Sequence, residues 1–319
     1  MTQTDVTARA RAASVPAQPS VVTARAWLQA PPAASGVLRV RPLPSEATAS
    51  YVQRLATAYR LALPQLLDGA GITLTGYGTP PTAELILTAR AARHVAALAR
   101  IPLPHLRHAL PHLALLDDAH DTETAAARWK RLEAGQQPVR ACTRCTRHRS
   151  HNATDTAWVH RPRHRLVCPR HQQAAPDPRL TSTVRTRAVP ELVAAHHAHQ
   201  RLRRHPRTLT AWTAARAITT RWYDHQQHLT HRWRQRLTRL IADSPHLVTT
   251  GSASPALLAR DLVTYPETVA LARTLAVLQN PPHRTTDDAL SLIAHRLGLP
   301  HLASNANDPL WAFLTHTRH

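Results

Sequence analysis

Two short stretches, Cys142-Thr143-Arg144-Cys145 and Cys168-Pro169-Arg170-His171, organise the sequence. They form two C-x2-C/H pairs separated by 22 residues, and together they use all three cysteines of the chain. A C-x2-C turn places two sulfur atoms on one side at the spacing of tetrahedral zinc, and a second such turn completes four ligands. The pattern predicts a zinc ribbon with short β-hairpins and one structural Zn2+ per chain, held by Cys142, Cys145, Cys168 and His171.

Two alternatives to structural zinc have less support in the sequence. A thioredoxin-type redox pair at Cys142 and Cys145 needs a βαβ context, which the neighbouring residues do not provide. A catalytic zinc needs an open coordination position, and the zinc deaminase signature needs an H-x-E motif, which occurs nowhere in the chain. Only His171 has the knuckle spacing, but four other histidines in the same segment remain alternative fourth ligands: His148, His151, His160 and His164.

The chain is strongly basic, and the charge is concentrated in its middle. Its 319 residues carry 40 Lys and Arg against 19 Asp and Glu, a formal net charge of +21 with histidine neutral. Residues 121–250 hold 24 of the basic and 8 of the acidic residues, whereas the charges of residues 251–319 balance. Because a polyanion is the natural partner of such a segment, we expect contact with double-stranded DNA.

Hydrophobic periodicity predicts a mainly α protein with helical domains on both sides of the ribbon. The core must consist mainly of Leu, Ala, Val and Ile, since aromatic residues make up only 4% of the chain. Helices are predicted over residues 47–60, 87–100, 189–243, 256–279, 286–297 and 308–315. We expect a disordered tail over 1–35, an N-terminal helical domain over 36–120, the ribbon over 138–178 and a C-terminal helical domain over 180–319.

A short pattern, apolar-x-Leu-Pro-x-Leu, follows three of the predicted helices, at residues 61–66, 101–106 and 297–302. Proline suits the first position of a helix, where its missing N–H costs no hydrogen bond. Helix, short turn and Pro-started helix is the outline of a helix-turn-helix, and equally of any tight helical hairpin. Simple packing is favoured, because the residues after each turn are poor in Arg and Lys apart from Arg107.

Residues 208–242 contain no Gly or Pro and are predicted to form one long basic helix or two closely joined helices. Six apolar residues form a stripe along it: Ile218, Trp222, Leu229, Trp233, Leu237 and Leu240. At about 100° per residue, one flank of this stripe carries Arg221, His225, His228, Arg232 and Arg239. These side chains either follow DNA phosphates or cover apolar surface with their stems. The candidate DNA contacts are therefore Arg221, His228, Arg232 and Arg239, together with Arg144, Arg147 and Arg163 of the ribbon.

The sequence also resembles a known family. The residues Pro42-Leu-Pro-Ser-Glu46-Ala-Thr-Ala-Ser50-Tyr51-Val-Gln-Arg54-Leu55-Ala56 resemble the opening motif of the TniQ family, in which Pro, Glu, Ser-aromatic and Arg-Leu-Ala follow one another. The two cysteine pairs with Trp158 between them are similar to the zinc ribbon of the same family. The motifs stand in the family's order over roughly residues 40–175. The chain departs from many relatives in having no cysteine after Cys168, so a second zinc site is not expected.

The resemblance implies a non-enzymatic accessory protein of DNA transposition, related to the target-selecting TnsD proteins, that recruits a transposition ATPase and transposase. The alternative is a stand-alone zinc-containing DNA-binding protein or transcriptional regulator. An enzyme has little support, because no nucleophile motif, Walker loop or carboxylate cluster has workable spacing. No membrane or small-molecule partner is expected, and the odd cysteine count favours a cytoplasmic, nucleoid-associated protein.

Overall fold

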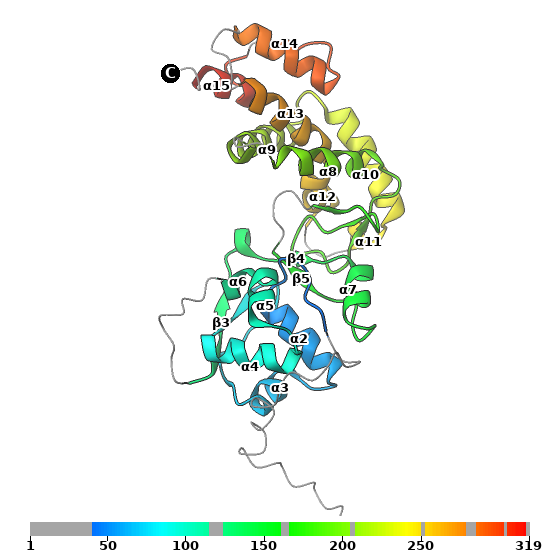
Figure 1. Ribbon diagram of the computed structural model, residues 1–319. Helices are drawn as coiled ribbons and strands as arrows, with labels where there is room; N and C mark the ends of the chain where they lie inside the picture. Colours follow the sequence, from blue (N-terminus) through cyan, green and yellow to red (C-terminus); the bar gives the residue numbers. More distant parts are fainter. Residues whose placement is uncertain are drawn as a thin grey trace, which may run out of the picture.

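The computed structural model describes residues 40–114, 124–160, 166–204, 208–249, 253–278, 285–302 and 305–316. The chain is mainly α-helical with a few short strands, as the periodicity predicts. Two groups of elements lie at opposite ends of the molecule in Figure 1. We call residues 40–160 the N-terminal lobe and residues 166–316 the C-terminal lobe, because the buried apolar clusters of the described residues fall on one side or the other of residues 161–165.

The N-terminal lobe combines short helices with a small sheet. Its helices are α2 (Thr48–Ala58), α3 (Leu63–Gly69), α4 (Ala89–Ala99), α5 (Leu103–Ala109) and α6 (Pro111–Ala114). Strands β1 (Thr73–Thr75) and β2 (Ala83–Leu87) flank β3 (Ala126–Arg131), with β1 parallel and β2 antiparallel to it. This sheet is not among the elements predicted from the sequence. The residues of β3 are mostly Ala and Arg, which have little strand preference, so tertiary contacts decide their pairing.

The first half of the ribbon packs on the N-terminal lobe. Strand β4 (Val139–Arg140) pairs antiparallel with β5 (Trp158–Val159), and α7 (Thr143–Arg149) lies between them in the chain. The Ala47 amide donates to the Trp158 carbonyl over 2.9 Å, which joins the start of α2 to β5. A small apolar cluster fills this junction: Leu43, Ala141, Ala157 and Val159.

The second half of the ribbon packs on the C-terminal lobe. Strands β6 (Val167–Cys168), β7 (Gln173–Ala174) and β8 (Val184–Arg185) form an antiparallel sheet in that order. Val167, Ala174 and Val184 belong to the same apolar cluster as the helices that follow. Those helices are α8 (Glu191–Leu202), α9 (Thr208–Asp224), α10 (Thr230–Asp243), α11 (His246–Thr249), α12 (Pro255–Val263), α13 (Tyr265–Leu278), α14 (Thr286–Leu297) and α15 (Pro309–His316). Helix α13 packs against α8, α9, α12 and α14.

The structure decides between two alternatives for one predicted element and differs in detail from two others. The basic region 208–242 forms two closely joined helices, one of its two predicted alternatives, because α9 ends at Asp224 and α10 begins at Thr230. The region 256–279, predicted as one helical stretch, is divided into α12 and α13. The Leu-Pro pattern starts α3 and α5, with proline in the first helical turn of each, but its third copy, around Pro300, lies outside any helix. In the described part of the chain, no helix has both the length and the apolar character needed to span a membrane.

Candidate functional site

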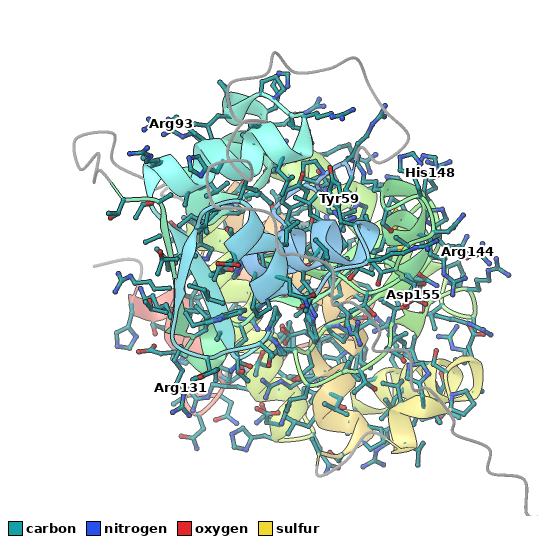
Figure 2. The ribbon with its side chains drawn as sticks, turned by 90° about the horizontal axis from the view of Figure 1, so that it is seen from below. Tyr59, Arg93, Arg131, Arg144, His148 and Asp155 are labelled. Atoms are coloured by element: carbon teal, nitrogen blue, oxygen red, sulfur yellow. The ribbon has the colours of Figure 1, made fainter. Side chains whose placement is uncertain are left out.

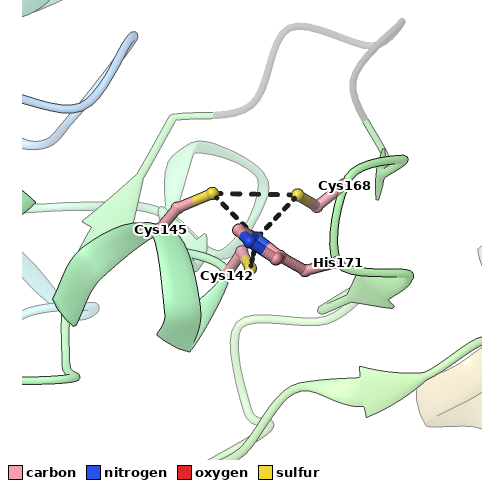
Figure 3. Close-up of side chains that lie close together, drawn as sticks. All are labelled: Cys142, Cys145, Cys168 and His171. Atoms are coloured by element: carbon pink, nitrogen blue, oxygen red, sulfur yellow. Dashed lines mark hydrogen bonds between the residues drawn. The ribbon is translucent and has the colours of Figure 1, made fainter. Parts of the chain in front are cut away.

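Three cysteines and one histidine converge between the two lobes (Figure 3). The Sγ atoms of Cys145 and Cys168 are 3.8 Å apart. The Nδ1 atom of His171 lies 3.3 Å from Cys142 Sγ, 3.2 Å from Cys145 Sγ and 3.8 Å from Cys168 Sγ. In a tetrahedral zinc site the edges are about 3.8 Å between two sulfurs and about 3.5 Å between sulfur and nitrogen. The four residues therefore lie close together in an arrangement that is compatible with zinc.

The four side chains come from different local structures. Cys142 directly precedes α7 and Cys145 lies in its first turn. The first pair therefore lies at the start of a helix, whereas the predicted zinc ribbon would place it in the turn of a β-hairpin. Cys168 ends β6, and His171 lies in the turn to β7, where Gln172 adopts a left-handed conformation with φ of 50°. The Gln173 Oε1 atom accepts hydrogen bonds from Cys142 Sγ at 3.0 Å and Thr143 Oγ1 at 3.1 Å. Gln173, which follows the second pair, is thus hydrogen-bonded to the first pair.

The three cysteines of the cluster alter one another's acidity. Hydrogen bonds from the Cys142 and Cys145 thiols lower the pKa of Cys168. Hydrogen bonding with Cys142 and Cys168, together with burial, raises the pKa of Cys145. The protein by itself therefore favours one thiolate at a time, because two adjacent thiolates repel each other. A divalent cation removes that repulsion and allows all three thiolates to form.

A buried ion pair fixes the segment that supports the ribbon. Arg54 Nε lies 2.7 Å from Glu46 Oε1, and Arg54 Nη2 lies 2.7 Å from Glu46 Oε2, with the two side chains 2% and 0% exposed. Arg54 Nη2 also donates to the Arg41 carbonyl at 2.9 Å, and Tyr51 Oη donates to the Val40 carbonyl at 3.1 Å. These contacts order the chain leading into α2. The Glu, aromatic and Arg positions of the family motif therefore have structural roles.

The same motif reaches the ribbon through Ser50. Its hydroxyl donates to Glu46 Oε1 at 3.0 Å and accepts the Trp158 amide at 2.8 Å. Trp158 in turn stacks under the Arg140 guanidinium, whose Cζ lies 4.7 Å from the ring centroid. The opening motif is therefore joined to the ribbon by a hydrogen bond from the main chain of Trp158.

The predicted row of basic side chains on residues 208–242 is not continuous. The chain turns between α9 and α10, where Gln226 and His228 have left-handed φ angles of 53° and 50°. His228 Nε2 lies 2.7 Å from the mostly buried carboxylate of Asp308. Helix α10 therefore does not extend the face on which Arg221 lies.

The arginines of α10 make internal contacts. Arg232 donates to the Leu297 carbonyl at 2.8 Å, and Arg239 donates to Glu191 Oε1 at 2.7 Å. Their side chains remain 42% and 44% exposed. Arg221 is exposed, and within the described parts of the chain it has no charged partner. The stripe itself is buried as predicted, except that Leu237 is only partly covered.

The basic residues of the ribbon gather on α7. Figure 2 shows Arg144 and His148 pointing away from the body of the molecule. Arg147 is 60% exposed and pairs with Asp155 at 2.9 Å. Arg163 and His164 lie outside the described residues.

Of the alternative ligands, His148 and His151 are exposed, and His160 points to Glu84 instead of to the sulfur atoms. The cluster of Glu84, His112 and His160 was not recognised from the sequence, because its members are far apart in the chain.

The fold and the site define a mainly helical protein built around a Cys3His cluster that is compatible with zinc. Residues 37–174 match the family model described as TniQ, and this part of the chain belongs to the TniQ family. The predicted resemblance is thereby confirmed. The match associates the chain with DNA transposition and with a non-catalytic adaptor role. Neither the curated proteins nor the solved structures include a match to the chain.

Proposed function

We propose that the protein is a non-enzymatic, DNA-associated adaptor of DNA transposition. In this role it binds double-stranded DNA, helps to select the target site and recruits a transposition ATPase and transposase. The observation that carries the proposal is a TniQ domain at residues 37–174 in a chain of net charge +21. A protein with this role acts in the cytoplasm at the nucleoid, where its DNA partner is.

The Cys3His cluster serves this function as a structural centre in the proposal. Cys142, Cys145, Cys168 and His171 would hold one Zn2+, and the distances of 3.2–3.8 Å between their ligand atoms support this assignment. Four protein ligands leave no open position, so the metal would supply folding energy and not chemistry. Because site assembly and local folding are one equilibrium, Cys145→Ser should unfold the ribbon rather than change one contact.

Elemental analysis of purified protein tests the zinc assignment. About one tightly bound zinc per chain is expected, and His171→Ala should lower that content. The matched control is His148→Ala, since His148 is exposed on α7 and its loss should leave the zinc in place. Folded protein without zinc, or a loss caused by His148→Ala instead, would contradict the ligand assignment. His164→Ala should also retain the metal.

The surface proposed to meet DNA is the exposed side of α7. Arg144, Arg147 and His148 lie there on one short helix, whereas Arg232 and Arg239 of α10 are engaged by carbonyl and carboxylate groups of the protein. Arg147 is 60% exposed and its one acidic partner, Asp155, is 46% exposed, so this pair is easily exchanged for a contact with a phosphate. Phosphate contacts of this kind position a protein on DNA without reading its sequence.

Binding to a short duplex, followed by fluorescence anisotropy over a range of salt concentrations, tests this surface. The affinity of the unmodified protein should fall with salt at a slope of about −0.9 per neutralised phosphate. Arg144→Gln with Arg147→Gln should reduce the slope by up to about 1.8 for all sequences alike. The control pair is Arg273→Gln with Arg296→Gln, two exposed arginines on α13 and α14. A salt-independent affinity, or equal effects of both pairs, would exclude the α7 surface.

The second candidate function, a stand-alone transcriptional regulator, differs in its partners. An adaptor should copurify with a transposition ATPase from its host, and its own DNA binding should be only weakly sequence-selective. A regulator should hold one specific DNA site without a partner protein. Recovery of the ATPase in a pull-down supports the adaptor, whereas a single high-affinity site bound by the protein alone supports the regulator.

A further inference from the structure

A second group of potential metal ligands lies inside the N-terminal lobe, away from the cysteines. It consists of Glu84 on β2, His112 on α6 and His160 directly after β5. Their ligand atoms all lie within 4.8 Å of one another. Glu84 Oε2 is 2.9 Å from His160 Nε2 and 3.7 Å from His112 Nε2. Three segments that are distant in the chain therefore bring one oxygen atom and two nitrogen atoms close together.

The carboxylate is fixed before any ion arrives. Glu84 is fully buried, and its Oε1 atom accepts the backbone amides of Ala49 and Leu85, each at 2.8 Å. The other oxygen, Oε2, is left to face the two imidazoles. A carboxylate that is held in this way binds a cation without first losing conformational freedom, which favours coordination.

A hydrogen bond to Glu84 accounts for the position of only one of the two histidines. The 2.9 Å separation from His160 is that of an ordinary hydrogen bond, but the 3.7 Å separation from His112 is too long for one. Ligands about 2.1 Å from a shared ion are about 3.0 to 3.7 Å apart for angles of about 90° to 125° at the metal. Both separations lie at or close to that range. The spacing of His112 fits coordination better than it fits a direct contact.

The exposure of the histidines also suits coordination. The side chains of His112 and His160 are 27% and 17% exposed, so an ion can enter from solvent and keep water as a further ligand.

We propose that Glu84, His112 and His160 bind a second divalent transition-metal ion of the zinc class. Two imidazoles and one carboxylate are donors that Zn2+ accepts readily, and three protein ligands leave the coordination sphere open. The ion is more exchangeable than the one at the cysteines, because no thiolate holds it. It joins β2 and α6 to the first half of the ribbon through His160. The Cys3His centre and the role in transposition do not depend on this site.

Equilibrium dialysis of the full-length protein against buffered Zn2+, followed by elemental analysis, tests the proposal. The unmodified protein should gain about one zinc beyond the tightly bound one, and His112→Ala should abolish the gain while retaining the tightly bound zinc. The matched control is His108→Ala, an exposed histidine on α5, which should still gain the ion. No gain in the unmodified protein, or the same gain in His112→Ala, overturns the proposal. The second result would mean adventitious binding to other histidines.

Co2+ provides an independent readout. Added to the zinc-loaded protein, it should give weak visible d–d bands without the strong near-ultraviolet absorption of a cobalt–thiolate bond. His112→Gln, which keeps a polar side chain, should lose these bands and keep the circular dichroism of the unmodified protein. Thiolate absorption, or bands that survive in His112→Gln, would place the ion elsewhere and overturn the assignment.

Discussion

Single buried polar residues connect the parts of the N-terminal lobe. Glu46 accepts hydrogen bonds from the Leu43 amide, Ser50 and Arg54, so one carboxylate orders the chain on both sides of it. Glu84 does the same for the start of α2 through the Ala49 amide. The motif that indicates the family is therefore a packing motif, and a change at these positions should act through stability.

Arg54→Ala should destabilise the protein by about 3–5 kcal/mol, because it leaves the fully buried Glu46 without its cation. Chemical denaturation followed by circular dichroism measures the loss. Gln53→Ala, at the exposed neighbouring position of α2, is the control and should change the free energy of unfolding by less than about 0.5 kcal/mol. Equal effects of the two substitutions would show that the buried pair does not stabilise the lobe.

Asp308 makes stability depend on pH in the acid range. Burial alone raises the pKa of its carboxyl, but hydrogen bonds from His228, the Leu310 amide and Trp222 outweigh burial and lower the pKa below its usual 3.8. The stability that this carboxylate contributes is complete above pH 3.8 and is lost as the pH falls through the folded pKa. Asp308→Asn should be less stable than the unmodified protein at pH 5. The difference should shrink as the pH falls toward 3, whereas a constant difference would contradict this account.

The helices differ in how far the sequence predicts them. Helices α2, α4 and α14 were predicted within a few residues, because each has an apolar face of helical period. Two closely joined helices were one predicted alternative for residues 208–242, but the position of the break after Asp224 was not predicted, since no Gly or Pro marks it. His228, which lies just after the break, contacts Asp308, a residue 80 positions later in the sequence. The sequence prediction applied the geometry of one continuous helix across this break. It therefore placed Arg221 and Arg239 on the same flank, although the two residues lie on different helices.

The arginines of α10 should therefore act on stability instead of on DNA binding. Arg232→Gln with Arg239→Gln removes contacts to the Leu297 carbonyl and to Glu191, which are partly exposed and worth on the order of 1 kcal/mol in total. Thermal unfolding should show a lower midpoint, and the salt slope of DNA binding should stay unchanged. A slope reduced by about 1.8 with unchanged stability would instead place α10 on the DNA.

At the scale of the whole molecule, the ribbon connects two cores. The spacing of the cysteines indicated the four residues that the structure brings together, but it could not predict that each pair packs on a different lobe. That division follows from burial: Ala141 and Val159 pack near α2, whereas Val167 and Ala174 pack among the C-terminal helices. Hydrophobic periodicity identifies single helices and strands. It does not indicate against which of the two cores a strand of only two residues will pack.

Removal of zinc should consequently separate the lobes without unfolding them. Each lobe keeps its own apolar core, while the cluster supplies ligands from both sides of residues 161–165. Chelation should increase the radius of gyration in small-angle X-ray scattering and leave most of the helical circular dichroism in place. Cys145→Ser should reproduce the increase, and His148→Ala should not. Loss of helicity on chelation would mean that the metal supports the cores themselves. An unchanged radius would mean that contacts such as those of Gln173 with Cys142 and Thr143 hold the lobes together without the ion.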